Sequence, residues 1–376
     1  MFDQKKLLEY TLSYEEYPAF ESGLTSSLLV GLYNVLSSSS IVPSSAHVRI
    51  IAMFMYLLSG WILFSTFSEH NTFVFSLLFM LLLFTSRFPF LWLSSELFAG
   101  AFLMLLLWSV TQNLPFIVIS ILTSLFMLSK PDLIFSGIVV GFFLAFFCEK
   151  KNLKCRLINV VIFLTIAVAP ILPGLLRDGL SYLAPQGRAI FSFGQHYAAM
   201  VAKHQMVSVR PDPWLEWEAY FTPVWGQVRT LTGVVISSPA KYLDFVFLSM
   251  AQSIKNFLRS NLFLLLPVSI YGWIKTHHSN LKMVSVFLLS GFIPITLLSF
   301  THTRYIARFY PLFLFIIYLY LTEFKTTNRT VSRLALVEFT TRQQEGFFIL
   351  CYLLFVLALQ LYQLPPVFTA GHWFPD

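Results

Sequence analysis

The sequence is poor in charged residues and in cysteine. Charged side chains make up 11% of the 376 residues, whereas soluble domains carry about 25%, and this difference excludes an ordinary soluble domain. The three cysteines, Cys148, Cys155 and Cys351, form no C-x-x-C pair, which excludes a disulfide scaffold and a cysteine-based zinc module. The net charge is +7, but the basic residues lie between apolar runs and not in one stripe. That pattern indicates membrane topology, not nucleic-acid binding.

Long apolar runs, by contrast, are abundant. Hydrophobic residues make up 57% of the chain and the mean hydropathy is +0.72; at about 20 residues per span this is enough for roughly ten transmembrane helices. Apolar runs bounded by charge or proline lie at 48 to 67, 72 to 85, 90 to 110, 114 to 129, 133 to 148, 157 to 173, 261 to 274, 283 to 300, 305 to 321 and 347 to 362. The sequence therefore predicts an all-α fold, a polytopic transmembrane bundle of about 10 to 11 helices.

The basic residues of the predicted loops indicate the orientation. Clusters that fall on one side of the membrane follow the fifth, seventh and ninth predicted spans: Lys150, Lys151, Lys154, Arg156, Lys275, Lys282, Lys325, Arg329, Arg333 and Arg342. Because cytoplasmic loops carry an excess of lysine and arginine, we expect these loops in the cytoplasm and the long segment 174 to 260 outside.

This topology divides the chain into four parts. They are an N-terminal outer acidic segment with an amphipathic helix (1–47), transmembrane helices 1 to 6 (48–173), a mostly helical extracytoplasmic segment (174–260) and transmembrane helices 7 to 10 (261–376). One alternative stays open in the first part. Residues 24–36 are apolar but short, which favours an amphipathic or re-entrant helix; if they span the membrane instead, the N-terminus lies in the cytoplasm.

Several charged residues lie at the outer ends of predicted spans: Glu96, Arg87, Lys130, Arg304 and Arg308. A charge at membrane depth costs about 2.5 to 3.5 kcal/mol, so each is a functional candidate. The four-residue spacing of Arg304 and Arg308 places both on one helical face, and guanidinium and ammonium groups suit a bound phosphate. The alternatives are a solvated helix-end carboxylate for Glu96, a structural turn for Lys130, and arginines that reach out to lipid phosphates.

Acidic and aromatic residues accompany these cations. Glu15 and Glu16 lie in the N-terminal segment, and a carboxylate beside phosphate-binding cations can activate a hydroxyl nucleophile next to a phosphate leaving group. In the long outer segment, His196, Trp214 and Trp217 combine a hydrogen-bonding ring with aromatic faces that stack on sugars. The alternatives are a solvated acidic terminus and aromatic anchors at the bilayer surface.

The order of these motifs resembles the GT-C superfamily of polytopic membrane glycosyltransferases, which includes protein O-mannosyltransferases and the lipid A aminoarabinose transferase. The matching elements, over roughly residues 15 to 321, are Glu15-Glu16, Arg49 in Ala46-His47-Val48-Arg49, Glu96 in Ser94-Ser95-Glu96, Lys130 in Ser129-Lys130-Pro131, the long outer segment, and Arg304 in Thr303-Arg304-Tyr305. The acidic motif departs from the family pattern, which more often has Asp-Glu or a single Asp.

The resemblance implies inverting transfer of a sugar from a polyprenyl-phosphate donor to a glycan, lipid or protein acceptor, on the extracytoplasmic side of a bacterial inner membrane. The implied residues are Glu15, Glu16 and Glu96 as catalytic groups, Arg87, Lys130, Arg304 and Arg308 for the donor phosphate, and His196, Trp214 and Trp217 for the sugar or acceptor. Some relatives use a divalent metal, Mg²⁺ or Mn²⁺, but no ligand cluster in the sequence demands one. The alternatives are a transporter or flippase of an anionic lipid or solute, and a non-catalytic subunit of an envelope polysaccharide complex.

Overall fold

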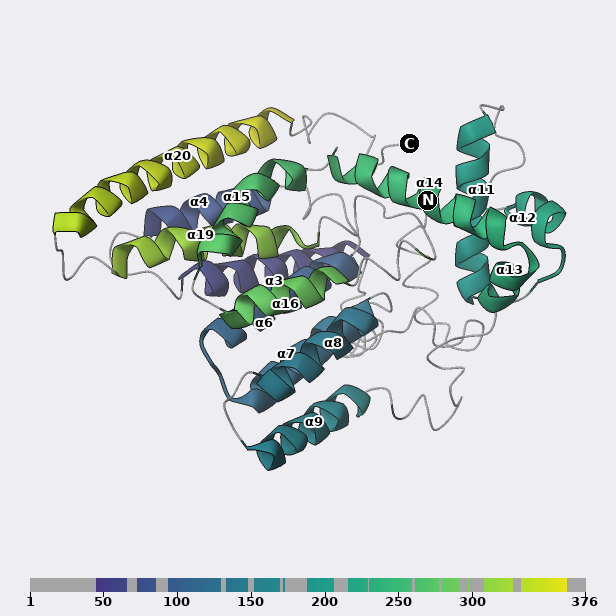
Figure 1. The fold of residues 1–376 in the computed structure, drawn as a ribbon, viewed down its shortest axis with the longest axis horizontal. Helices are drawn as coiled ribbons and strands as arrows, with labels where there is room; N and C mark the ends of the chain where they lie inside the picture. Colours follow the sequence, from purple (N-terminus) through teal and green to yellow (C-terminus); the bar gives the residue numbers. More distant parts are fainter. Residues whose placement is uncertain are drawn as a thin grey trace.

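The computed structural model describes residues 45–65, 73–85, 94–129, 133–147, 152–169, 172, 188–205, 216–228, 230–258, 261–276, 279–290, 297, 308–326 and 333–363. Within these ranges the regular structure is helical and no strand occurs (Figure 1), which confirms the predicted all-α class. The helices are α3 (Ser45–Ser65), α4 (Phe73–Thr85), α6 (Ser94–Thr111), α7 (Phe116–Ser129), α8 (Ile134–Phe147), α9 (Leu153–Val168), α11 (Arg188–Gln205), α12 (Glu218–Trp225), α13 (Leu231–Ser237), α14 (Pro239–Leu258), α15 (Asn261–Lys275), α16 (Ser279–Ser290), α19 (Tyr310–Thr326) and α20 (Arg333–Gln363).

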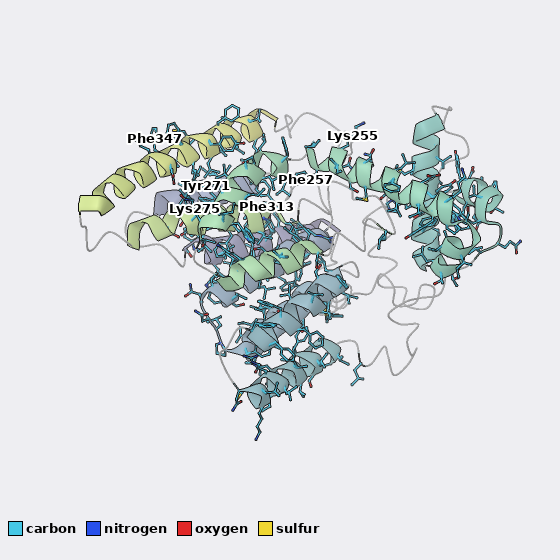
Figure 2. All side chains as sticks on the ribbon, viewed as in Figure 1. Lys255, Phe257, Tyr271, Lys275, Phe313 and Phe347 are labelled. Carbon is cyan, nitrogen blue, oxygen red and sulfur yellow. The ribbon has the colours of Figure 1, made fainter. Side chains whose placement is uncertain are left out.

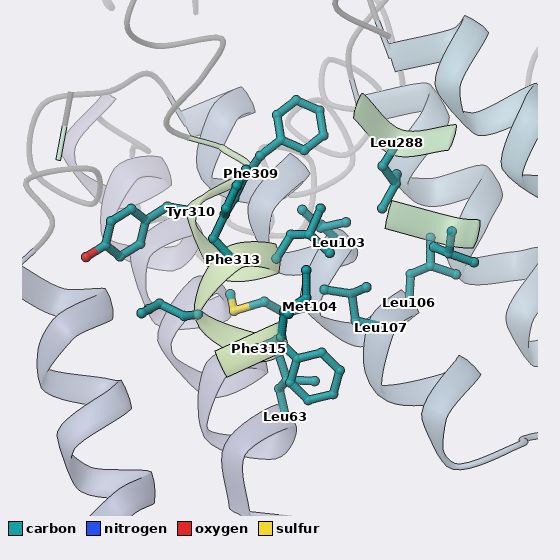
Figure 3. Close-up of a cluster of buried hydrophobic side chains, with 14 of the residues drawn as sticks. Leu63, Leu103, Met104, Leu106, Leu107, Leu288, Phe309, Tyr310, Phe313 and Phe315 are labelled. Atoms are coloured by element: carbon teal, nitrogen blue, oxygen red, sulfur yellow. The ribbon is translucent and has the colours of Figure 1, made fainter. Parts of the chain in front are cut away.

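Helix α19 lies at the centre of the larger group of helices, which we call the bundle: α3, α4, α6, α7, α8, α9, α15, α16, α19 and α20. Every residue from Arg308 to Leu321 is buried, and α3, α4, α6 and α15 pack around α19. From Tyr310 to Leu321 the helix contains no charged residue. A helix that is apolar around its whole circumference is enclosed by other helices. Figure 3 shows a cluster of buried hydrophobic side chains in the bundle, in which Phe313 of α19 lies beside Leu103 of α6.

Helices α7, α8 and α9 pack closely because α8 has glycine where its neighbours approach. At Gly137 a Cβ atom would lie 2.4 Å from the Cβ of Met127 in α7, and at Gly141 it would lie 2.1 Å from Cζ of Phe163 in α9. Only a residue without a Cβ permits these approaches. Small residues at helix–helix contacts are typical of helices that associate in membranes.

Helices α3, α9, α16 and α20 begin earlier than their apolar runs predicted, and α20 shows the largest difference. Helix α20 begins at Arg333 and not near residue 347, and α16 begins at Ser279 and not at residue 283. The added first turns contain Arg, Glu, Gln and Lys, which are good helix formers, whereas hydropathy marks only the apolar part of a helix. Part of the predicted cytoplasmic loop before α20 is therefore helical.

Several described helices are shorter than the roughly 20 residues of a membrane span: α4 has 13 residues, and α7 and α8 have 14 each. In the part of the chain that the structure describes, no single helix has both the length and the apolar composition needed to cross a membrane; by these two criteria only the pair of α13 and α14 qualifies, and this pair is bent by 114°. The predicted set of 10 to 11 spans stays a prediction.

Helices α11, α12, α13 and the first half of α14 form a smaller group with its own hydrophobic cluster, which we call the aromatic cluster. Its buried members are Ile190, Phe193, Met200, Phe221, Trp225, Val234 and Phe245. Figure 1 shows this group beside the bundle, with α14 leading from it to α15. The described part of the predicted outer segment is thus helical, as expected.

Candidate functional site

Arg308 occupies the turn directly before α19 and is 1% exposed. Its guanidinium carbon lies 5.5 Å from the centroid of the Phe309 ring, within the range of a cation–π interaction. An arginine that reaches out to lipid phosphates keeps its guanidinium at the surface, and the burial of Arg308 excludes that alternative for this residue. A guanidinium presents its N–H donors in a planar fork that matches a carboxylate or a phosphate, so this buried position is a candidate for binding an anion.

Next to Arg308, buried hydrogen bonds join three helices. The side-chain amide of Gln360 in α20 donates to the Tyr310 hydroxyl in α19, and the Thr85 hydroxyl in α4 lies 2.8 Å from Oε1 of Gln360. Thr85, Tyr310 and Gln360 are at most 2% exposed. Tyr56 of α3 is also fully buried. The hydrogen bonds of Gln360 with Tyr310 and Thr85 fix the start of α19, and with it Arg308, relative to α4 and α20.

Glu96 lies in the first turn of α6, near the same end of the bundle. Helix α6 begins a short distance along the chain after Thr85, the last residue of α4, and it packs beside α19 (Figure 3). Its first turn therefore extends toward the end at which α4 ends and α19 begins. The structure describes the backbone of Glu96 but not its side chain.

Six predicted site residues lie outside the described residues: Glu15, Glu16, Arg87, Lys130, Trp214 and Arg304. Two of them directly follow described helices. Arg87 comes two residues after the end of α4, and Lys130 follows the last residue of α7. Because the short segment 112–115 joins α6 to α7, α7 ends at the end of the bundle where α6 begins. The last residues of α4 and α7, which precede Arg87 and Lys130 in the sequence, thus lie at the end that contains Arg308.

His196 lies on α11 and Trp217 directly precedes the neighbouring helix α12, at the aromatic cluster. The Trp217 ring packs on Gly194, where a Cβ atom would lie 2.0 Å from its Cε3, and its centroid is 5.3 Å from that of Phe221. Trp217 is half-buried and His196 is 7% exposed. The structure places these two predicted sugar contacts on α11 and at the start of the adjacent α12, while their role with a sugar stays a prediction.

Tyr197, which follows His196 and was not among the predicted site residues, adds a hydroxyl to the aromatic cluster. Its ring meets that of Trp225 edge-on, with centroids 4.4 Å apart. Burial raises the pKa of Tyr197 above its ordinary value of 10.0, because the ionised form is poorly solvated there. The hydroxyl therefore keeps its proton at neutral pH and can act as a hydrogen-bond donor.

A second polar cluster lies at the opposite end of α19. The Tyr320 hydroxyl donates to Oε2 of Glu345 in α20 at 3.0 Å, and its ring centroid is 5.5 Å from that of Tyr271 in α15. Nζ of Lys275 lies 5.6 Å from the Tyr271 ring centroid, and both residues are labelled in Figure 2. These contacts hold α15, α19 and α20 together at the end remote from Arg308.

Sequence reasoning missed Gln360 and Thr85. A single glutamine inside the apolar run around Leu359 and Leu361 is the signal that was available, because a polar group at such a position usually pairs within the helix bundle. The identity of its partners was not readable, since Thr85 is 275 residues away along the chain.

Among the residues that the structure describes, no three His, Cys, Asp or Glu side chains are placed to hold a metal ion, and the possible Mg²⁺ or Mn²⁺ stays a prediction. Comparison of the sequence with the models of known protein families finds no match, and neither curated proteins nor solved structures include a detectable relative.

Proposed function

We propose that the protein is embedded in a membrane, because its bundle exposes large apolar side chains in continuous stripes. On α9, Leu153, Leu157, Val161 and Leu164 are all exposed, and their spacing places them on one helical face. Similar exposed apolar residues lie on α3, α4, α7, α8 and α20. Extended apolar surfaces of this kind mark contact with a membrane or with another protein.

Small polar residues lie in the interior of the bundle. On α7, Ser120, Thr123 and Ser124 are buried, and the Thr123 hydroxyl donates to the Ile119 carbonyl at 2.7 Å. Hydroxyl groups bonded to the preceding turn of their own helix need no water, and serine and threonine are enriched between helices in membranes. Apolar residues outside and small polar residues inside suit a lipid environment.

The proposed activity is that of an integral membrane glycosyltransferase, which moves a sugar from a polyprenyl-phosphate donor to an acceptor on the extracytoplasmic face of a bacterial inner membrane. The observation that carries it is Arg308, a fully buried cation at the end of the bundle where α4 and α7 end and α6 begins. In the sequence, Arg87 and Lys130 follow the ends of α4 and α7, and Glu96 lies in the first turn of α6. A buried guanidinium supported by further cations suits a phosphate leaving group.

In the proposed reaction the acceptor oxygen forms a bond to the anomeric carbon as the bond from that carbon to the phosphate oxygen breaks, with inversion. Glu15 or Glu16 takes the acceptor proton, with Glu96 as its positioning residue. The departing polyprenyl phosphate keeps the bonding electron pair, and Arg308, together with Lys130 and Arg304, stabilises its charge. A preorganised donor of this type is worth about 3 to 4 kcal/mol in the transition state. His196, Trp214 and Trp217 contact the sugar or the acceptor.

Replacement of Arg308 tests this proposal. The purified chain is reconstituted in vesicles with polyprenyl-phosphate-linked sugars and a membrane acceptor fraction, and released polyprenyl phosphate and transferred sugar are both measured. We expect Arg308→Gln to lower transfer about 10²-fold or more, while Arg308→Lys, which keeps the charge, retains more activity. Arg156→Gln, the same change at the start of α9, is the matched control and should leave transfer unchanged. Full transfer by folded Arg308→Gln would contradict the proposal.

A further inference from the structure

Helix α14 carries an apolar stripe that no described part of the chain covers. Leu243, Phe247, Met250, Ile254 and Leu258 follow one another at intervals of three or four residues, which places them on one helical face. They are 47% to 68% exposed. The stripe runs along almost the whole of the 20-residue helix.

The other sides of α14 differ from this stripe. Phe245 and Ser249 are buried on the side that meets the aromatic cluster, so the helix is anchored there in a defined orientation. Lys241, Asp244 and Lys255 are exposed and share a third side of the helix. An exposed apolar face beside a charged face, with lysines at both ends, is the arrangement of a helix that lies in the plane of a membrane surface.

The stripe continues toward the proposed lipid-facing surface of the bundle. Helix α14 ends two residues before α15 and packs against it, and the rings of Phe257 and Phe263 meet edge-on with centroids 6.2 Å apart. Figure 2 shows Lys255 and Phe257 at the end of α14 that approaches the bundle. On α15, Phe263 and Ile270 are exposed, so apolar surface extends from one helix to the next.

We infer that α14 lies in the plane of the membrane surface, with its apolar stripe inserted into the lipid bilayer and its lysines directed to lipid phosphates. An in-plane helix of this type inserts its apolar face about 5 to 10 Å into the headgroup and acyl boundary. The bend of 114° between α13 and α14 and the charged side of α14 oppose a helix that crosses the bilayer, because a crossing would bring Asp244 into hydrocarbon. In this position α14 holds the aromatic cluster, with His196, at the bilayer surface. The inference rests on the proposed membrane location.

Site-directed spin labelling of the full chain tests the position of α14. Cysteines are introduced one at a time at Phe247, Met250 and Ile254 in a background without native cysteines, and the protein is reconstituted in vesicles of phosphatidylethanolamine and phosphatidylglycerol. Matched labels at Asp244 and Lys255 report the charged side of the same helix. Relaxation by oxygen, which dissolves in lipid, is compared with relaxation by a water-soluble nickel chelate.

We expect the three stripe labels to respond to oxygen and not to nickel, at one common shallow depth, and the two charged-side labels to respond in the opposite way. A depth that increases steadily along α14 would indicate a crossing helix, and nickel access at the stripe would indicate a solvated face. Spin–spin broadening between copies without oxygen access would indicate a dimer contact. Each of these three results overturns the inference.

A label at Leu354, on the exposed side of α20, separates this inference from the proposed function. If Leu354 responds to oxygen while the stripe does not, only the inference about α14 fails. If the stripe labels and the Leu354 label all respond to nickel and not to oxygen, the bundle is not in the bilayer. The membrane proposal then fails together with the inference.

Discussion

Replacing Gln360 with leucine tests whether the buried hydrogen bonds at the start of α19 contribute to the free energy of unfolding. Gln360 is fully buried and bonded to both Tyr310 and Thr85, so the substitution leaves two hydroxyls in an apolar interior. Thr85 retains an alternative, because its hydroxyl also lies 2.7 Å from the Leu81 carbonyl, whereas the Tyr310 hydroxyl loses the amide that donates to it. A buried group without a partner costs about 1 to 3 kcal/mol and an interhelical hydrogen bond in a membrane averages about 0.6 kcal/mol, so we expect a loss of about 1 to 2 kcal/mol in the free energy of unfolding.

A double-mutant cycle with Tyr310→Phe assigns this loss to the hydrogen bond. Unfolding is followed by circular dichroism during titration of mixed micelles with sodium dodecyl sulfate. We expect a coupling energy of about 0.6 to 1.7 kcal/mol between Gln360→Leu and Tyr310→Phe. Gln344→Leu, on the same helix but exposed, is the matched control and should change the free energy of unfolding by less than about 0.5 kcal/mol. A coupling energy near zero would contradict a stabilising hydrogen bond between Gln360 and Tyr310 at the start of α19.

Two glycine contacts give further predictions. Gly141→Ala places a Cβ atom where the Phe163 ring lies, so it should lower the free energy of unfolding by about 1 to 3 kcal/mol, and Phe163→Leu should recover part of that loss; an unchanged unfolding midpoint would contradict the close contact. Gly194→Ala should displace the Trp217 ring and shift tryptophan fluorescence to longer wavelength as the ring becomes solvated, while Gly346→Ala, where a Cβ atom meets nothing, should leave the spectrum as it is.

The helices could be predicted from the sequence because long apolar runs are a local property. The runs around residues 114 to 129 and 305 to 321 correspond to α7 and α19; the ends of α7 differ from its run by at most two residues and those of α19 by five. Where polar helix formers extend a helix, as from Arg333 into α20, hydropathy gave no signal for the true start. The 114° bend between α13 and α14 was also not predicted, since it is set by packing and not by composition.

The candidate site was only partly predictable, for a different physical reason. The position of Arg308 at a helix start was visible in the sequence, but its burial depends on helices far away in the chain. Gln360 and Thr85 meet across 275 residues, and no periodicity indicates such a pair. The pairing of Trp217 with Gly194 likewise depends on how α12 folds back on α11.

The sidedness of the N-terminal carboxylates tests the central claim most directly. Glu15→Cys is introduced in a background that lacks Cys148 and Cys351 and keeps Cys155, which lies near the start of α9 on the predicted cytoplasmic side. Intact cells are treated with a membrane-impermeant maleimide before and after permeabilisation. Labelling of position 15 in intact cells, with Cys155 labelled only after permeabilisation, is the predicted result, because it places the base on the face that carries the phosphate site. Labelling of both positions only after permeabilisation would separate the base from that site by a bilayer and contradict the proposed glycosyltransferase.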